Sequence, residues 1–400
     1  MLINSIILLN VIQWEISLQI VEYLHIHFIL KCLFIVLISV YGIINKSVNL
    51  NRRAKLGVVI MNKTVSIVIP CRNEENYIEQ CIKSFLVQSY PQELIEIIVA
   101  DGMSTDNTRK IIDEMKKEHK NIKLLDNLKL SAPTGMNLGI KESKSDIIII
   151  FGAHAYADKD FVRENVLALE GKDIGCAGGV ITTINDSIKG EAIAEAMSCP
   201  FGVGNALFRY AEKEAFVDTV GFGAYDRKFI IDIGLFDEEL VRNQDDELNF
   251  RVQKAGKKIL LNPKIKATYF SRGDFKKLWR QYYQYGFWKV RVIQKHKKPA
   301  SIRHLIPLMF VLFLLGGGIL SIFSKLIFIG YLLTLLLYLL LDLTFSVKIC
   351  KKKSIKHLPY LFITFPILHI SYGVGFIMGL FNFYIFKSKS MEEKNKKISR

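Results

Sequence analysis

Between residues 65 and 151, short runs of β-branched and other apolar residues alternate with longer segments whose apolar residues recur at helical spacing. The short runs predict strands at residues 65–70, 94–101, 122–125 and 146–151. The longer segments predict helices at residues 77–87, 108–119 and 134–143. Strands that alternate with helices in this way indicate an α/β fold with a mainly parallel, doubly wound sheet.

Polar residues directly follow the first, second and fourth of these strands. The three stretches read CRNEEN at residues 71–76, DGMSTDNT at residues 101–108 and GAHAYAD at residues 152–158. Ligands of a doubly wound sheet bind beyond the carboxyl ends of its strands, so we expect these loops to meet at one crevice. Each loop alone also has a structural explanation, because acids and small polar residues begin helices and form turns.

The C-terminal third of the chain contains long apolar runs. Residues 305–323 carry no charge and residues 326–347 carry only Asp342, and each run is long enough to cross a bilayer. Residues 358–386 are also apolar but less uniform, and residues 27–44 are a weaker candidate. We therefore expect a membrane protein.

The formal net charge is +16, and much of it comes from lysine and arginine clusters beside the apolar runs, at residues 51–55, 289–298 and 348–357. The positive-inside rule explains these clusters without a nucleic-acid partner. If residues 348–357 are cytoplasmic, the first two C-terminal runs form a hairpin with its turn outside, and the region before the hairpin is cytoplasmic. For residues 358–386 two alternatives stay open, a re-entrant segment or an external basic tail.

These patterns divide the chain into five parts. They are residues 1–60 with the candidate membrane helix at 27–44, a catalytic domain at 61–275, a basic aromatic segment at 276–300, transmembrane helices within 301–387 and a basic tail at 388–400. Six cysteines are scattered without a CxxC pair, which is typical of a reduced cytoplasmic domain and argues against a zinc ribbon or disulfide framework.

Three segments that occur in order carry a family resemblance. They are residues 65–108, PTGMNLGI at residues 133–140 and the stretch from GAYDRKF to QKAG at residues 223–256. From about residue 65 to residue 298 the chain resembles the family 2 glycosyltransferases with a GT-A fold, and in particular the membrane-bound enzymes that extend lipid-linked exopolysaccharides such as succinoglycan. The resemblance implies a hexosyltransferase of the EC 2.4 class, with a Rossmann-like mixed sheet and C-terminal transmembrane helices.

The resemblance also implies a nucleotide-sugar donor, in particular a UDP-sugar, and residues that bind it. By position in the motifs they are Pro70, Arg72, Asn73, Glu74, Asp101, Asn137 and Ala153. Asp101 would hydrogen-bond uracil or ribose, and Asn137 would lie beside the diphosphate.

A metal ligand is implied at residues 152–154, where the subgroup has the sequence Asp-Ala-His and this chain has Gly-Ala-His. His154 would ligate a divalent cation, Mn²⁺ or Mg²⁺, with Mn²⁺ favoured because Mg²⁺ prefers oxygen ligands. Gly152 removes the acid that usually supports the metal or ribose. A histidine that is only packed or hydrogen-bonded is the alternative.

Inversion at the transferred sugar requires a carboxylate that accepts the acceptor's proton. The stretch NQDDELNF at residues 243–250 supplies the candidates. Asp245 is the predicted base, because Gln244 replaces the first acid of the family's pair, and Asp246 is the fallback. The alternative is that these acids only begin a helix capped by Asn243.

Two glycine-rich aromatic stretches, residues 198–210 and 221–226, predict a mobile loop that closes over substrate, or else an ordinary surface loop. The basic aromatic segment at residues 279–298 is expected to direct most of its charge to the membrane.

The same segment lies where processive relatives have a QxxRW motif, but Gln284 and Tyr285 replace its arginine and tryptophan. Gln281, Tyr285 and Trp288 are the predicted acceptor contacts.

We therefore predict an inverting glycosyltransferase of the plasma membrane that acts on a lipid-linked or polysaccharide acceptor in cell-surface glycan synthesis, with its catalytic domain in the cytoplasm. The alternatives are a processive polysaccharide synthase and a catalytically impaired scaffold subunit with the same fold.

Overall fold

A computed structural model of the chain describes residues 62–271, 273–299 and 301–396. The expected membrane segment at residues 27–44 lies outside these ranges. The described residues from Lys63 onward belong to one compact unit.

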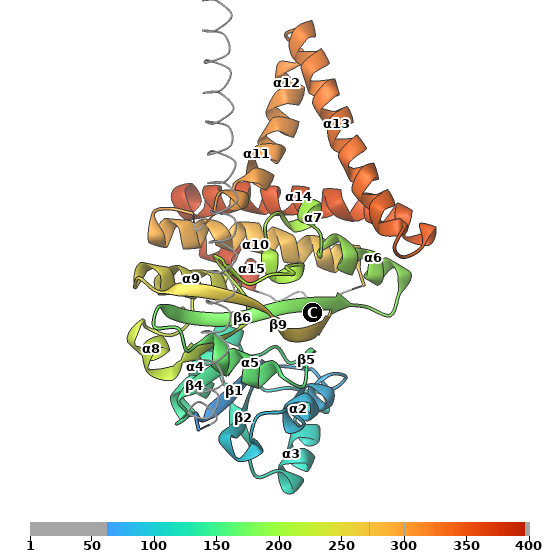
Figure 1. The fold of residues 1–400 in the computed structure, drawn as a ribbon. Helices are drawn as coiled ribbons and strands as arrows, with labels where there is room; N and C mark the ends of the chain where they lie inside the picture. Colours follow the sequence, from blue (N-terminus) through green and yellow to red (C-terminus); the bar gives the residue numbers. More distant parts are fainter. Residues whose placement is uncertain (1–61, 272, 300, 397–400) are drawn as a thin grey trace, which may run out of the picture. The chain divides into compact units, whose positions relative to one another are not determined.

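A nine-stranded mixed sheet forms the centre of this unit (Figure 1). Its order is β3-β2-β1-β4-β8-β6-β9-β5, and β7 pairs with β9 off this path. The strands are β1 (Val65–Cys71), β2 (Ile95–Asp101), β3 (Ile122–Asp126), β4 (Ile147–Ile150), β5 (Ala155–Ala157), β6 (Ile174–Ile184), β7 (Ala215–Phe216), β8 (Gly221–Asp226) and β9 (Lys258–Phe270). The first four strands pair in parallel, and β8 is antiparallel to β4 and to β6.

Helices connect the parallel strands and continue beyond the sheet. In the catalytic part they are α2 (Ile78–Leu86), α3 (Thr108–Glu118), α4 (Ala132–Glu142), α5 (Phe161–Ala168), α6 (Ile188–Ala196), α7 (Pro200–Val203), α8 (Arg227–Asp232) and α9 (Gln244–Lys254), with 3-10 turns η1 (Gln92–Leu94) and η2 (Leu207–Arg209). The strands and helices predicted between residues 65 and 151 are confirmed, each end within about two residues.

The parallel strands form because their apolar runs are buried on both faces. All four residues of β4 are buried, as are five of the first six in β1, which is typical of a sheet covered by helices on both sides. A Cβ added at Gly139 of α4 would come within 2.4 Å of the Val68 side chain in β1. Glycine at this position therefore lets the helix pack directly on the strand.

The prediction of a mobile loop at residues 221–226 is wrong. These residues form β8, an interior strand that pairs with β4 and β6. Their glycine content reflects close packing, because a Cβ on Gly221 would come within 2.0 Å of Ile181 in the neighbouring strand. Residues 198–210 contain the short helical elements α7 and η2.

Two long helices, α10 (Phe275–His296) and α14 (Leu358–Leu380), lie along each other between the sheet and the remaining apolar helices (Figure 1). Their backbones approach closely at glycines. A Cβ on Gly286 of α10 would lie 2.0 Å from the Tyr372 carbonyl oxygen, and a Cβ on Gly375 of α14 would lie 2.0 Å from that of Tyr283. Small residues are the usual means of bringing apolar helices into such contact.

The other C-terminal elements form an apolar hairpin and a final helix. They are η3 (Ile302–His304), α11 (Ile306–Leu312), the π-helical η4 (Phe313–Gly317), α12 (Gly318–Leu320), α13 (Lys325–Cys350), η5 (Ile355–His357), the π-helical η6 (Phe381–Phe386) and α15 (Lys389–Lys396). Among the described residues, three helical segments are long and apolar enough to cross a membrane: Ile302–Leu320, Lys325–Cys350 and Ile355–Phe386. The first two expose most of their apolar side chains, whereas the third is nearly half buried against the protein.

The basic tail returns to the catalytic domain. The carbonyl oxygen of Asn395 in α15 accepts hydrogen bonds from Gln284 Nε2 at 3.0 Å and from Trp288 Nε1 at 3.3 Å, both on α10. This contact places the tail beside the catalytic domain, and both alternatives for residues 358–386 remain predictions.

Candidate active site

The loops after β1 and β2 are joined by hydrogen bonds, as expected for the edge where parallel strands end. The Asn73 N–H donates to Ser104 Oγ at 2.8 Å, and Asn73 Oδ1 accepts from the Thr105 N–H at 2.9 Å. Asn73 adopts a left-handed conformation with φ 56°, which asparagine tolerates better than most residues. Together with Pro70 and Arg72 it lines a cavity of about 700 Å³, which the loop at residues 127–134 closes on another side.

Two of the residues predicted to bind the nucleotide-sugar donor, Asp101 and Asn137, do not line this cavity. Asp101 is fully buried, and its carboxylate accepts from Arg109 Nη1 at 2.8 Å and from the Ser104 N–H at 2.9 Å. Asn137 of α4 exchanges hydrogen bonds of 2.8 and 2.9 Å with the backbone of Phe236. Both side chains hold neighbouring loops in place rather than lining the cavity.

Glu74 and His154 lie together although 80 residues separate them in the sequence. His154 Nδ1 is 3.3 Å from Glu74 Oε1, and its ring meets the Tyr269 ring edge-on at 4.8 Å. Glu74 is buried and His154 is partly exposed, while the adjacent Ala153 is buried. The expected corner at the end of β4 therefore contains one imidazole and one carboxylate.

This pair does not form a complete metal site from protein ligands. Within the described part of the chain, no group of three or more His, Cys, Asp or Glu side chains could hold a metal ion. Glu74 and His154 supply at most two ligands, and divalent cations such as Mg²⁺ commonly complete their coordination with substrate phosphates. The residues present fit a cation only if a bound diphosphate provides further ligands.

Gly152 has a physical explanation in the structure. A Cβ at this position would come 3.0 Å from Cε1 of Phe222, which adopts φ 53° and packs on the Phe151 ring at 4.2 Å. The Phe222 ring therefore occupies the space into which a side chain at position 152 would extend.

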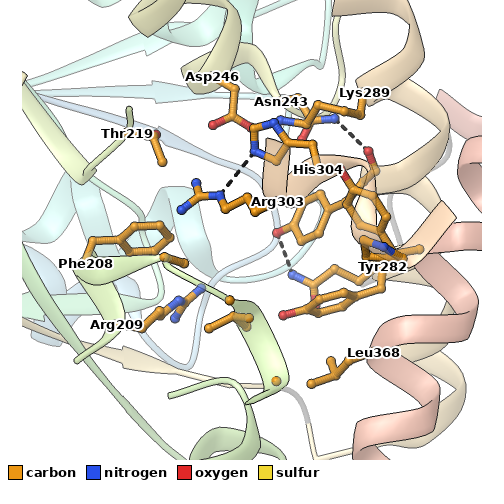
Figure 2. A pocket seen from close by; sticks show the side chains of 18 of the residues that line it. Phe208, Arg209, Thr219, Asn243, Asp246, Tyr282, Lys289, Arg303, His304 and Leu368 are labelled. Atoms are coloured by element: carbon orange, nitrogen blue, oxygen red, sulfur yellow. Dashed lines mark hydrogen bonds and ion pairs between the residues drawn. The ribbon is translucent and has the colours of Figure 1, made fainter. Parts of the chain in front are cut away.

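A second cavity, of about 630 Å³, contains the N-terminus of α9 and the two predicted acids. Figure 2 shows Asn243, Asp246 and Lys289 at one end of the view and Leu368 at the other. Asn243 begins α9 in a left-handed conformation with φ 60°, and its Nδ2 donates to the Tyr285 carbonyl oxygen of α10 at 2.9 Å. The start of α9 is thus fixed against α10.

Asp245 and Asp246 have opposite electrostatic surroundings. Asp246 forms an ion pair with the buried Lys289. Although burial opposes its ionisation, Lys289 and then His304 and Arg303 lower the pKa of Asp246 to about 2. Asp245 reaches the cavity and has no ion-pair partner among the described residues. The Asp245 side chain is exposed at the cavity surface, where desolvation by the surrounding protein and then the Asp246 carboxylate raise its pKa to about 7.

The predicted acceptor residues of α10 divide between the cavity and the core. Gln281 and Tyr285 line the cavity, and Gln281 Nε2 donates to the Tyr285 hydroxyl at 2.9 Å. Trp288 is fully buried and lies outside the cavity wall, where its indole donates to α15.

The expectation that most of the charge on this segment faces the membrane is wrong for its central residues. Lys289 is 3% exposed and pairs with Asp246, and Arg291 Nε lies 2.7 Å from Glu239 Oε1. Sequence analysis also missed the cavity residues Arg209, Arg242 and Arg303. No local motif marks them, because they meet only through the packing of η2, the segment before α9, and η3.

The structure thus combines a mixed sheet with one cavity beside β1 and a second cavity that holds paired carboxylates. Residues 66–234 match the sequence model of the glycosyl transferase family 2. A dolichyl N-acetyl-α-D-glucosaminyl phosphate 3-β-D-2,3-diacetamido-2,3-dideoxy-β-D-glucuronosyltransferase of Methanococcus voltae is 35% identical over 328 residues, which are 79% of this chain and 97% of that protein. The chain therefore belongs to glycosyltransferase family 2 and is a transferase.

A second relative agrees with this assignment, and a solved structure has a similar fold. The succinoglycan biosynthesis protein ExoA of Rhizobium meliloti is 28% identical over 247 residues, which are 60% of this chain and 74% of that protein. The structure of a mannosyltransferase from Pyrobaculum calidifontis, solved with GDP-mannose and Mn²⁺, superposes with a TM-score of 0.53 at 16% identity and covers 80% of this chain and 88% of that one. The predicted GT-A fold with apolar C-terminal helices is confirmed.

Proposed function

We propose that this glycosyltransferase moves a sugar from a nucleotide-sugar, in particular a UDP-sugar, to a lipid-linked acceptor with inversion at the transferred carbon. The observation that carries the proposal is the 630 Å³ cavity, which extends from Asp245 to side chains of the membrane helices such as Phe310 and Leu368. A soluble acceptor would not require this apolar wall. The relative from Methanococcus voltae is named for an acceptor of this kind, a dolichyl-linked sugar phosphate.

In this proposal the nucleotide occupies the 700 Å³ cavity beside Pro70, Arg72 and Asn73. Asp101 and Asn137 do not contact the nucleotide directly. They hold the loops around the cavity in place, Asp101 through Arg109 and Asn137 through the Phe236 backbone. Glu74 and His154 would hold a divalent cation together with the donor diphosphate, and such a cation supplies charge neutralisation to the departing diphosphate.

Asp245 accepts the proton of the acceptor hydroxyl as that oxygen attacks the sugar carbon opposite the leaving diphosphate. A base works best when its pKa is close to the working pH, and the pKa of about 7 meets this condition. Asp246 remains ionised and paired with Lys289, so it positions the start of α9 and raises the pKa of its neighbour. Gln281 and Tyr285 are then acceptor contacts in the same cavity.

The membrane arrangement follows from the charge distribution. The basic residues at 348–357 join α13 to α14, and positive loops are retained on the cytoplasmic side. The catalytic domain and α15 then lie in the cytoplasm, where nucleotide-sugars are available, and the turn near Lys325 lies outside.

The decisive experiment measures nucleotide release and glycolipid formation in membranes that contain the full chain, with panels of UDP- and GDP-sugars. We expect turnover with a UDP-sugar, a loss of at least about 100-fold in Asp245→Asn, and one sugar added per acceptor. Long products would instead identify a processive synthase. Transfer from GDP-sugars alone would overturn the donor assignment.

The same assay tests the cation. We expect EDTA to abolish transfer, and Mn²⁺ to restore it better than Mg²⁺ because the site includes an imidazole. His154→Ala should remove this preference. Unchanged turnover in EDTA would show that neither Glu74 nor His154 serves a metal.

A further inference from the structure

The cavity around Asp245 carries more positive than negative charge. Its charged lining consists of four cations and two carboxylates, namely Arg209, Arg242, Lys289, Arg303, Asp245 and Asp246. Two of the cations are compensated within the protein, since Lys289 pairs with Asp246 and Arg303 Nη2 lies 3.1 Å from Asp218 Oδ2. The other two, Arg209 and Arg242, have no carboxylate partner among the described residues.

Uncharged groups hold both arginines in position. Arg209 Nη1 donates to Thr183 Oγ1 at 2.9 Å, and its guanidinium lies 5.1 Å from the Phe208 ring centre. Arg242 Nε donates to Gln284 Oε1 at 3.3 Å, and its guanidinium lies 5.7 Å from the Tyr285 ring centre.

Arg242 also contains an unused hydrogen-bond donor. Its Nη2 atom is buried and has no hydrogen-bond partner within the described part of the chain. A buried cationic donor without a partner is costly, and this cost is recovered when an anion binds. A planar guanidinium suits a phosphate in particular, because it can donate two parallel hydrogen bonds.

Part of the remaining cavity wall is apolar and comes from the short helix α7 and the membrane helices. Phe201 of α7 and Phe310 of α11 contribute, as do Tyr338 of α13 and Leu368 of α14. Figure 2 shows Arg209 beside Phe208 on one side of the view and Leu368 on the other, with Asp246 at the top. A ligand that contacts the carboxylates, the arginines and the apolar side chains of this cavity has a sugar, an anionic group and an apolar chain.

We propose that Arg209 and Arg242 bind the phosphate that joins the acceptor sugar to an isoprenoid chain, and that the chain begins against Phe201, Phe310 and Leu368. This assignment rests on the proposed function and names the part of the acceptor that the protein holds. It places the sugar hydroxyl toward Asp245 and the lipid toward the membrane helices. The phosphate thereby serves as a fixed point that sets which hydroxyl reaches the base.

The test measures binding of farnesyl phosphate and of farnesol to the full chain in detergent by isothermal titration calorimetry. Neither probe contains a sugar, so the result does not depend on which sugar the natural acceptor carries. Wild type should prefer farnesyl phosphate by about 10- to 100-fold, the range expected for hydrogen bonds to a charged group. Arg209→Gln and Arg242→Gln should each reduce that preference about tenfold or more and leave farnesol binding unchanged.

Two kinds of control variant accompany the test. Arg163→Gln changes an arginine of α5 that lines neither cavity, and it should keep the wild-type preference. Arg209→Lys and Arg242→Lys retain the charge and should keep part of the preference. They therefore separate loss of the phosphate contact from loss of the fold.

Equal affinity for farnesyl phosphate and farnesol in wild type would overturn the assignment, as would an equal loss in Arg163→Gln. Displacement of farnesyl phosphate by phosphatidylglycerol micelles at similar affinity would also overturn it, because the site would then belong to a membrane lipid headgroup. Failure of the proposed function gives a different result, namely no sugar transfer to lipid by wild type whatever the arginine variants bind.

Discussion

Asp245 and Asp246 are neighbours in sequence with different electrostatic surroundings, and this difference decides which of them can act as a base. Asp246 is held ionised by Lys289, 43 residues further along the chain. Asp245 is exposed at the surface of the cavity and lies next to that fixed negative charge, which, together with desolvation by the surrounding protein, raises the pKa of its carboxyl group. Of the two candidates, Asp245 is the one available to take up a proton.

This arrangement predicts the pH dependence of the reaction. A raised pKa means that Asp245 is protonated, and inactive as a base, below pH 7, and deprotonated above it. We expect kcat/KM to rise about tenfold per pH unit below pH 7 and to level off above it. In Asp245→Asn the residual rate should lose this dependence. A profile that is flat between pH 5 and pH 8 in wild type would contradict the assignment.

A second prediction concerns the effect of a side chain at position 152 on stability. Gly152→Asp places a Cβ 3.0 Å from the Phe222 ring, and overpacking of this kind costs about 1 to 3 kcal/mol. We expect the melting temperature to fall by several degrees. The Phe222→Ala substitution opens this space. Gly152→Asp should therefore lower the melting temperature much less in the Phe222→Ala protein than in wild type. Melting curves of the four proteins in this double-mutant cycle measure the difference.

If Gly152→Asp costs the same stability in both backgrounds, Phe222 does not fill the position. A gain of activity in the double variant over Phe222→Ala alone would show that the missing acid limits catalysis. No gain would show that the enzyme works without it.

At the scale of the elements, α10 links the catalytic centre to the membrane part. One side of this helix contributes Gln281, Tyr285 and Lys289 to the cavity, and another packs against α14 at Gly286. A displacement of α10 would therefore move the partner of Asp246 and the carbonyl that holds Asn243. Packing between α10 and α14 should control activity as well as stability.

Gly286→Ala tests this link. Its Cβ would lie 2.0 Å from the Tyr372 carbonyl oxygen, and a backbone atom cannot move aside as a side chain can. We expect a melting temperature lower by several degrees and a clear loss of activity. Gly330→Ala is the matched control, because no atom lies within 4 Å of the added Cβ on α13. Similar behaviour of the two variants would mean that the close approach at Gly286 is not required.

At the scale of the whole molecule, the turn of the apolar hairpin and the C-terminal tail are predicted to lie on opposite sides of the membrane. The turn before α13 is expected outside the cell, whereas α15 contacts α10 and lies with the catalytic domain. In this arrangement the segment Ile355–Phe386 does not carry the chain across, although its length and composition would allow it. The helix α14 within this segment packs against α10 and α6.

Cysteine labelling tests this topology. Lys325→Cys and Ser390→Cys introduce exposed thiols at the hairpin turn and in α15, in a background from which the native accessible cysteines are removed. An impermeant maleimide should label the Lys325→Cys protein in intact cells and the Ser390→Cys protein only after permeabilisation. Labelling of both in intact cells would show that the third segment crosses the membrane.

The sequence by itself determined the elements and their order between residues 65 and 151. These strands are continuous apolar runs and the helices between them have a regular period, so local pattern and burial agree. It also determined the family motifs, the loops that meet at the end of the sheet, and the apolar hairpin, because each depends on residues close together in the chain. The strand β8 was missed, since its glycines resemble a loop until the packing of Ile181 beside Gly221 is known.

Only the tertiary structure decided which side chains share a site. It paired Lys289 with Asp246, set Glu74 beside His154 and filled the space at Gly152 with Phe222. It also placed Arg209 and Arg242 in one cavity from separate elements and returned α15 to α10. These relations depend on the packing of distant segments, whose interaction energies leave no periodic or local mark in the sequence.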